Sequence, residues 1–534
     1  MLAAVVVSGI AVRAIPVAVP TPLVQIALGA AIAATSSYEV QLDPEIFFLL
    51  FLPPLLFLDG WRIPKEGLLR DKGMILELAL GLVFCTVLGM GFFIHWMIPA
   101  IPFAVAFALA AIVSPTDPVA VSAITARVPV PKRVMHVLEG ESLLNDASGL
   151  VCFRFAVAAA LSGTFSLPSA VLTFVRLALV GVLVGVALTY GVMWSKNWIS
   201  RKFGEETGLK VLVSVLIPFG AYAAAEQLGG SGILAAVAAG ITMSYAELTG
   251  GAVATTRMQR TAVWDTMQFA LNGVMFVLLG EQLPAILAGA VNVVQQSNHD
   301  NPWWLAVYVL AINFGLACLR FAWVWLSIRV TAFVATLRGE VAAEKPSLRL
   351  IAAMSVAGVR GAITLAGVLT LPLALPNDAP FPARDLTIFL AAGVIIMSLI
   401  ASSIALPRLL AGLPALEPAH DVEVERALAA SSEAAIRAVE EALHGMASGH
   451  SDADLYAESA ARVMDLYRRR LEGQMTSENA ARIRQGDDIE RRLRLAALRA
   501  ERDTLFALAR ADEISDATSR ELVRDIDLLE ERIR

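Results

Sequence analysis

The sequence predicts an all-α polytopic membrane protein with about 13 transmembrane helices, followed by a helical cytosolic domain. The first observation is composition: of 534 residues, 57% are hydrophobic and 17% charged, with a mean hydropathy of +0.67. A soluble domain carries about 25% charged residues. The second is that apolar runs recur up to residue 407, and the third is a change of composition after Leu416. We therefore expect a transmembrane domain over 1–414 and a cytosolic tail over 415–534.

Thirteen apolar runs are long enough to cross the hydrocarbon core of a bilayer. They lie near 2–18, 21–35, 45–60, 74–98, 102–124, 134–160, 169–195, 209–226, 231–248, 262–281, 303–328, 349–374 and 385–407. Pro16, Pro20 and Pro22 blur the boundary between the first two. The chain turns apolar at Leu2 without a charged region before it, so we expect a first membrane segment there and not a cleaved signal peptide.

Basic residues predict the topology of these spans. One set of loops contains Arg62, Lys65, Arg70, Lys72, Arg127, Lys132, Arg133, Lys196, Arg201, Lys202, Lys210, Arg257, Arg260, Arg338, Lys345 and Arg349. The alternate loops contain only Arg384. Because cytoplasmic loops collect Lys and Arg, the first set is predicted to be cytoplasmic. An odd number of spans then places the N-terminus outside and the tail inside the cell.

The tail carries the acidity of the whole chain. From Glu417 onward it has 18 arginines, no lysine and 26 acids, whereas the rest of the chain has a small positive balance. Apolar residues at helical spacing predict helices near 421–447, 453–472, 477–511 and 514–533, with breaks at Gly449 and Gly486. We interpret the tail as a solvated helical domain with a dimerising or regulatory face.

Several classes of protein are disfavoured. Cys85, Cys152 and Cys318 lie far apart in apolar spans, which is typical of small core residues and not of a disulfide or metal set. No basic-aromatic patch suggests nucleic acid. His95 and His136 are isolated, and the sequence contains no nucleophile–base set, Gly-rich phosphate loop or metal cluster. We therefore expect neither an enzyme nor a bound cofactor.

A proline-broken acidic segment lies inside the fifth span, at Ser114-Pro115-Thr116-Asp117-Pro118. Each proline removes a backbone donor and disfavours helix just before it. Free carbonyls at membrane depth are tolerated only where they line a cavity or are buried in protein, and such broken helices hold ions in secondary transporters. The simpler alternative is a proline kink in which Asp117 caps the second half-helix.

The next span carries Glu139-Gly140-Glu141-Ser142-Leu143-Leu144-Asn145-Asp146. Ser142 and Asp146 are four residues apart and share one helix face, and Glu141 and Asn145 share the adjacent face. A hydroxyl and a carboxylate supply hard oxygen ligands that suit Na⁺. Burial favours the protonated form of a carboxyl group and a bound cation favours the ionised form. Competition of a cation and a proton for Asp146 is the minimum mechanism for an antiporter.

Other ionisable residues lie within the spans. Arg320 and Arg360 need anionic or carbonyl partners in the bundle, and a permanent ion pair is the expected state of Glu141. Asp59 ends a proline-broken helix and is either a cavity acid or an interface residue at the cytoplasmic mouth. Arg154 and Arg176 are expected to be snorkelling or structural residues.

These motifs together resemble the electroneutral sodium/proton exchanger branch of the monovalent cation/proton antiporters, in the bacterial form with a cytosolic tail. The resemblance covers residues 20–410 and lies in Thr116-Asp117-Pro118, Glu141-Ser142-Leu143-Leu144-Asn145-Asp146, Gly358-Val359-Arg360-Gly361-Ala362, Trp264 and Asn272-Gly273-Val274-Met275-Phe276-Val277-Leu278-Leu279-Gly280. It implies inverted repeats, two crossed and broken helices, a moving core domain and a dimer-forming domain.

The resemblance also implies roles for the site residues. Asp146 would be the carboxylate that exchanges cation and proton, and Ser142 and the main chain at Thr116 would help to bind Na⁺. Asp117 would meet Asn145 nearby. In this family, asparagine in place of a second acid before Asp146 accompanies the exchange of one proton per cation.

Three further residues have implied roles in assembly or in the cavity. Glu141 would pair with Arg320 to hold the core together, and Arg360 would stabilise the broken helices. Many relatives carry an acid where this chain has Leu58. Asp59 is displaced by one residue, about 100° around a helix, so it would reach the cavity only if the helix were locally unwound.

The function expected from these observations is exchange of Na⁺ or Li⁺ for H⁺ by alternating access, serving pH and sodium homeostasis in the cell membrane, by a homodimer. K⁺/H⁺ exchange is the alternative within the class, because the sequence does not fix the size of the cavity. A tail-gated cation channel or sensor is the alternative from another class, although channels often use repeated filters or charged rings, and no repeated loop is present.

Overall fold

The computed structural model describes the whole chain except residues 15–18, 36–43, 63–76, 118–131, 164–166, 204–206, 248–253, 297–300, 302, 338–346, 377–378, 412–417, 448–452, 473–477, 512, 515 and 534. Pro118, the proposed break at Gly449 and six of the loop residues used for the topology lie outside the described residues; those six are Lys65, Arg70, Lys72, Arg127, Arg338 and Lys345.

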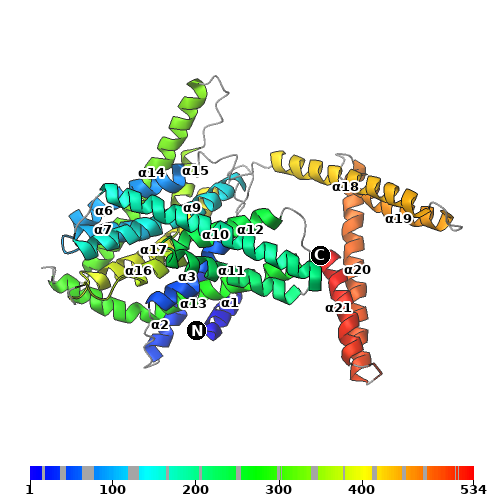
Figure 1. The fold of residues 1–534 in the computed structure, drawn as a ribbon, viewed down its shortest axis with the longest axis horizontal. Helices are drawn as coiled ribbons and strands as arrows, with labels where there is room; N and C mark the ends of the chain where they lie inside the picture. Colours follow the sequence, from blue (N-terminus) through cyan, green and yellow to red (C-terminus); the bar gives the residue numbers. More distant parts are fainter. Residues whose placement is uncertain are drawn as a thin grey trace. The chain divides into compact units, whose positions relative to one another are not determined.

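The described residues form helices almost throughout, which confirms the predicted all-α class (Figure 1). Their only β feature is an isolated bridge between Ala374 and Pro380. The chain divides into two compact units, Met1–Ala415 and Leu416–Arg534.

Each of the thirteen predicted spans coincides with a helix, or with an interrupted helix, within the described part of the first unit. These elements are α1 (Leu2–Ala14), α2 (Thr21–Thr35), α3 (Pro44–Arg62), η1 with α6 (Glu77–Leu82 and Val83–Met97), α7 (Phe103–Ile112), α9 (Lys132–Ser162), α10 (Leu167–Phe203), α11 (Thr207–Gln227), α12 (Gly232–Glu247), α13 (Ala254–Gln296), α14 (Trp303–Leu337), α15 with α16 (Leu348–Val356 and Ala362–Leu369) and α17 (Arg384–Leu410).

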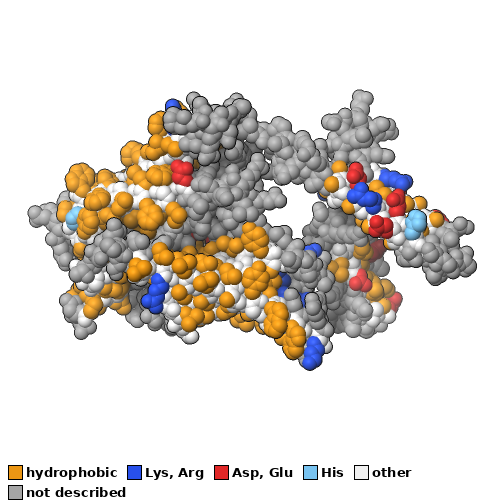
Figure 2. Space-filling view, turned by 45° about the horizontal axis from the view of Figure 1, so that its top comes forward, with side chains coloured by type: hydrophobic (Ala, Val, Ile, Leu, Met, Phe, Trp, Pro, Cys, Tyr) orange, Lys and Arg blue, Asp and Glu red, His pale blue; other side chains and the backbone are white. Residues whose placement is uncertain are grey.

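The surface of this unit is apolar, as contact with lipid requires. Figure 2 shows hydrophobic side chains over most of its described face, with few charged groups among them. Large side chains such as Trp194, Leu183 and Phe314 are 72%, 65% and 72% exposed. Six helices in the described residues are long and apolar enough to span a membrane. A polytopic membrane protein accounts for this surface.

Helix α13 is much longer than the predicted span at 262–281. It has 43 residues, or about 64 Å at 1.5 Å per residue, which is about twice the thickness of a hydrocarbon core. The hydropathy pattern locates only the lipid-buried middle of a helix, because polar turns beyond it continue the same backbone hydrogen bonding.

The helices pack in two related sets. Helix α2 packs on α13 and α3 packs on α12; α1 contacts α2 and α13, while α11 contacts α12 and α3. Counted in spans, α1, α2 and α3 are each seven before α11, α12 and α13. Replacing each helix by its counterpart turns the pair α2–α13 into α12–α3, α1–α2 into α11–α12, and α1–α13 into α11–α3. Seven is odd, so equivalent helices run in opposite directions if successive spans alternate in direction. This is the relation expected of inverted repeats.

Glycines make the two equivalent crossings close. A Cβ atom on Gly29 of α2 would collide with the Val277 carbonyl of α13, and one on Gly280 of α13 would collide with the Ile26 carbonyl. Gly60 of α3 and Gly240 of α12 approach the partner backbone in the same way. Small residues let helix backbones approach in membranes, where no hydrophobic effect drives helices together.

The end of α7 meets the break between α15 and α16. Helix α7 ends at Ile112 and the chain from Pro115 to Asp117 is not helical, while α15 and α16 are separated by 357–361. The Asp117 N–H donates to the Val359 carbonyl at 2.7 Å. Pro115 accounts for the first break, because it has no N–H to continue the helix.

The second unit consists of α18 (Pro418–Ala447), α19 (Ala453–Glu472), α20 (Glu478–Arg510) and α21 (Asp516–Ile533). Helix α18 packs on α19, and α20 packs on α21, where Arg502 forms ion pairs with Asp527 (2.8 Å) and Glu530. The predicted break at Gly486 is wrong, because α20 continues through it. One exposed glycine costs a helix about 1 kcal/mol relative to alanine, which a helix of 33 residues tolerates.

Close packing at Gly240 predicts a loss of stability in Gly240→Ala. The new Cβ would meet the Phe57 carbonyl and, at 2.9 Å, the Trp61 nitrogen, and overpacking typically costs about 1–3 kcal/mol. We expect a lower melting temperature in detergent, followed by fluorescence-detected gel filtration. Gly191→Ala in α10 is the matched control, since nothing lies within 4 Å of its added Cβ. Equal melting of the two variants would contradict this packing.

Candidate functional site

A pocket lies where the two breaks meet α3, α9 and α13. It contains about 420 Å³ of space that no atom occupies, counted out to its open mouth. Its lining residues are Leu55, Asp59, Pro115, Thr116, Asp117, Ser142, Asp146, Gln268, Asn272, Gly361, Ile363 and Thr364. The structure therefore brings Thr116, Asp117, Ser142 and Asp146, which the sequence singled out, to one cavity.

Ser142 and Thr116 form the oxygen-rich corner of the pocket. The Ser142 hydroxyl donates to the Thr116 carbonyl at 2.7 Å, and both residues are buried. The donated hydrogen leaves the lone pairs of the Ser142 oxygen available, and a carbonyl oxygen has a second lone pair. The corner can thus offer two uncharged oxygens to a cation beside Asp146.

Three carboxylates face the pocket: Asp59, Asp117 and Asp146. Asp146, on α9, is the most deeply buried of the three, with 4% of its surface exposed. Among the described residues that line the pocket, all the charged ones are acids. Like charges in a low-dielectric site repel strongly, so the pocket has a strong attraction for a cation or a proton.

Asp59 reaches the pocket by a different route from the one expected. Helix α3 is continuous past it, so no local unwinding is needed. Leu58, where the resemblance led us to expect an acid, is instead buried in a hydrophobic cluster with Phe57 and Trp264. Asp59 faces the cavity because it lies four residues after Leu55, on the same side of α3. Both residues line the pocket.

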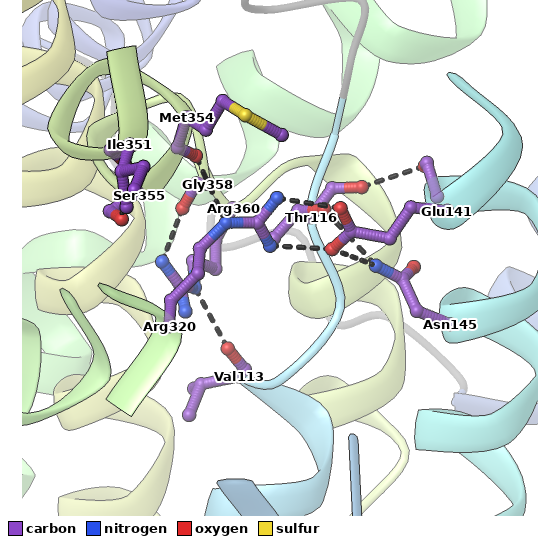
Figure 3. Close-up of polar contacts among 11 residues, drawn as sticks. Val113, Thr116, Glu141, Asn145, Arg320, Ile351, Met354, Ser355, Gly358 and Arg360 are labelled. Atoms are coloured by element: carbon purple, nitrogen blue, oxygen red, sulfur yellow. Dashed lines mark hydrogen bonds and ion pairs between the residues drawn. The ribbon is translucent and has the colours of Figure 1, made fainter. Parts of the chain in front are cut away.

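Asn145 contacts the pocket through Thr116. Its amide nitrogen donates to the Thr116 hydroxyl at 3.1 Å and approaches Glu141 Oε1 at 3.5 Å (Figure 3). Asn145, which directly precedes Asp146, therefore connects α9 to the broken segment by a hydrogen bond.

Glu141 and Arg320 form a buried bidentate ion pair. Arg320 Nη1 and Nη2 donate to Glu141 Oε1 and Oε2 at 2.5 and 2.7 Å, and Arg320 Nε donates to the Met354 carbonyl at 3.0 Å. The two side chains are 1% and 4% exposed. Figure 3 shows this pair beside the crossing of the interrupted helices. One guanidinium therefore joins α9, α14 and the C-terminal end of α15.

Arg360 lies between the ends of two half-helices. Its Nε donates to the Val113 carbonyl at 2.8 Å, its Nη1 to the Gly358 carbonyl, and its backbone N–H to the Ser398 hydroxyl at 3.2 Å (Figure 3). Val113 and Gly358 follow the C-termini of α7 and α15, where the helix dipoles are negative. The guanidinium satisfies the orphan carbonyls and offsets both dipoles.

Asp117 lies against the start of α16. A Cβ on Gly361 would collide with its carboxylate, so only glycine fits there. The positive end of a helix dipole stabilises a carboxylate. Asp117 is thereby placed between the N-terminus of α16 and the pocket.

Sequence reasoning missed the wall formed by α13. Gln268 and Asn272 both line the pocket and are four residues apart, on one face. Two amides at this spacing within an apolar span were the available signal. Gln268 accepts a hydrogen bond from Arg62 of α3 at 2.6 Å, and Phe57 stacks on Trp264 at 5.1 Å between the same two helices.

Arg154 and Arg176 lie away from the pocket. Arg154 pairs with Glu226 at 2.9 Å and donates to the Tyr222 hydroxyl at 3.3 Å, so it has a structural contact between α9 and α11. Arg176 is exposed on α10.

A bundle of membrane helices in which the end of α7 meets the break between α15 and α16, beside buried carboxylates, is typical of a secondary transporter. The model of the family described as "Sodium/hydrogen exchanger, transmembrane" matches residues 1–412. The chain belongs to this family of monovalent cation/proton antiporters, whose members are transporters and not enzymes.

Individual relatives agree with this assignment. The chain is 41% identical to YjcE of Escherichia coli, which is named as an uncharacterized Na⁺/H⁺ exchanger, over 98% of this chain and 96% of that one. It is 44% identical to a sodium, potassium, lithium and rubidium/H⁺ antiporter of Bacillus pumilus, over 77% of this chain and 60% of the relative. Its fold is similar to the sodium proton antiporter MjNhaP1 of Methanocaldococcus jannaschii, with a TM-score of 0.54, 18% identity, and coverage of 77% and 96%.

The buried ion pair predicts that Glu141→Gln destabilises the protein strongly. Neutralising one partner leaves Arg320 buried and unpaired, at a cost of about 3–5 kcal/mol. We expect a clear fall in melting temperature in detergent. Glu226→Gln, which breaks the half-exposed pair with Arg154, is the matched control and should cost less than about 1 kcal/mol. If Glu141→Gln melts like the unmodified protein, the pair does not hold the core together.

Proposed function

We propose that this protein exchanges Na⁺ or Li⁺ for H⁺ across the cell membrane by alternating access. The observation that supports the proposal most directly is Asp146, buried in a pocket whose neighbouring charges are acidic and whose corner is made by Ser142 and the Thr116 carbonyl. Such a carboxylate needs a positive partner, and a cation and a proton can occupy it only in turn.

The roles of the other residues follow from their contacts. Ser142 and Thr116 supply uncharged ligands to the cation beside Asp146. Asp117, stabilised at the start of α16, adds negative potential to the pocket. Asn145 donates to the Thr116 hydroxyl and so fixes the orientation of the broken segment.

Charge compensation supports an electroneutral exchange of one proton for one cation. Arg320 neutralises Glu141, and Arg360 lies in the same buried layer with the half-helix ends. The position before Asp146 is the neutral Asn145. Asp146 is then the carboxylate whose charge changes during the cycle.

Selectivity among monovalent cations is the open choice within the class. The relative from Bacillus pumilus is a sodium, potassium, lithium and rubidium/H⁺ antiporter, which supports K⁺ as a second substrate here. Proton flux in proteoliposomes with Na⁺, Li⁺ or K⁺ as the counter-ion compares the three directly. A tail-gated channel would instead carry net current at a far higher rate.

We further propose the orientation and assembly of the protein. The distribution of Lys and Arg places the N-terminus outside and the tail in the cytoplasm. With this orientation, Asp59 and Arg62 lie at the cytoplasmic end of α3. The working unit is a homodimer, in which the tail contributes a dimerising or regulatory face.

The proposal predicts that Asp146→Asn abolishes cation-dependent proton flux. The amide keeps the shape of the side chain but binds no proton at neutral pH and carries no charge for the cation. The measurement is the pH change inside proteoliposomes after a Na⁺ pulse, together with a melting curve to show that the variant is folded.

The matched control is Asp265→Asn, the same chemical change at a side chain that is 58% exposed, which should retain exchange. Sodium-dependent flux that persists in folded Asp146→Asn would rule out Asp146 as the exchanging group.

A further inference from the structure

Gln268 is fixed in the pocket wall by a residue outside the pocket lining. Arg62, near the end of α3, donates from Nη1 to Gln268 Oε1 at 2.6 Å. The Nη2 of the same guanidinium contacts Asp265 on α13. Asp265 and Gln268 are three residues apart, on one face of α13. A single arginine therefore spans both residues.

This contact determines which way the amide of Gln268 points. A guanidinium has five N–H donors and no acceptor, so the oxygen of the amide must face Arg62. The NH₂ group is then the polar group that Gln268 can present to the pocket. If Arg62 is replaced by an apolar residue, this hydrogen bond no longer fixes which end of the Gln268 amide faces the pocket.

The helices that carry this contact are held together independently of it. Phe57 of α3 stacks on Trp264 of α13 at 5.1 Å with an interplanar angle of 26°. The Trp61 indole donates to Glu247 of α12 at 2.9 Å, and Arg260 of α13 pairs with the same Glu247. The wall is therefore built to keep its shape when Arg62 alone is changed.

We propose that Arg62 is a positioning residue that keeps the carbonyl oxygen of Gln268 out of the cation site. This inference rests on the proposed function. Gln268 of α13 then offers N–H donors toward the pocket, which repel a cation. The oxygen ligands come from α9, the broken segment and Asp59 of α3. Gln268 thus adds no oxygen ligand to the cation, which favours its release.

The experiment measures the dependence of proton flux on Na⁺ concentration in Arg62→Met. The methionine keeps the apolar stem but donates no hydrogen bond, so the Gln268 amide can turn its oxygen toward the cation. One added ligand of this kind should lower the KM for Na⁺ by about fivefold, and lower the maximal rate because release is slower.

A double-mutant cycle separates orientation from charge, because Arg62→Met also removes a positive charge near Asp59. In a Gln268→Leu background no amide oxygen is present, so Arg62→Met should leave the KM within about twofold. An equal fall in KM in both backgrounds means that Arg62 acts through its charge, and it overturns the proposal. An unchanged KM in Arg62→Met overturns it as well.

Arg62→Gln tests the same point if Arg62→Met does not fold. The new amide carries an acceptor as well as donors, so either end of the Gln268 amide can face it. A fall in KM that disappears in the Gln268→Leu background supports orientation; no fall, or an equal fall in both backgrounds, overturns it. Asp265→Asn is the control, since it breaks the exposed ion pair and leaves the Arg62–Gln268 bond. If the unmodified protein shows no Na⁺-dependent flux, the proposed function itself fails; if it exchanges normally, only this inference is at risk.

Discussion

The constraint on which this structure depends is that backbone groups at membrane depth must find partners. Two helices break where they cross, and the breaks expose carbonyls at the ends of α7 and α15. Arg360 donates hydrogen bonds to the carbonyls of Val113 and Gly358. The Asp117 N–H donates to the Val359 carbonyl across the crossing. The backbone groups that each break exposes are therefore satisfied in part by residues of the other break. The close glycine-lined crossings of α2 with α13 and of α3 with α12 hold the surrounding helices in register.

The same compensation decides where chemistry occurs. Buried charges are costly unless they are paired, and the layer beside the crossing pairs them: Glu141 with Arg320, and the half-helix ends with Arg360. Asp146, on the adjacent face of α9, shares the pocket with two other acids, Asp59 and Asp117. A cation or a proton can supply the missing positive charge. In the proposed function the two exchange because Asp146 requires one of them and cannot bind both at once.

Much of the fold and of the candidate site could be predicted from the sequence, and the features that could not have physical explanations. Proline in an apolar run marks a break at Thr116, and residues four apart place Ser142 and Asp146 on one helix face. That these residues meet in one site was implied by the resemblance to the exchanger family. Hydropathy locates the lipid-buried part of a helix and not its ends, which is why α13 is longer than predicted. Gly486 was expected to break a helix, but one glycine is weaker than the propensity of its neighbours. Gln268 was missed because placing an uncharged amide in an apolar span costs less free energy than placing a charge there, so the residue does not by itself indicate a functional site.

The two sides of the pocket differ in kind, and this difference bears on transport. The side formed by α9 and the broken segment offers a carboxylate, a hydroxyl and a carbonyl, all acceptors suited to a hard cation. The side formed by α13 offers amides, one of which has its oxygen turned toward Arg62. Helix α3 adds the carboxylate of Asp59 to the pocket. In the proposed function, access to the site alternates as one part of the fold moves against the other. An oxygen ligand from Gln268 would add a further bond between the ion and α13, and the proposed role of Arg62 is to keep that oxygen away from the ion. The orientation of a single amide would then affect how readily the ion is released.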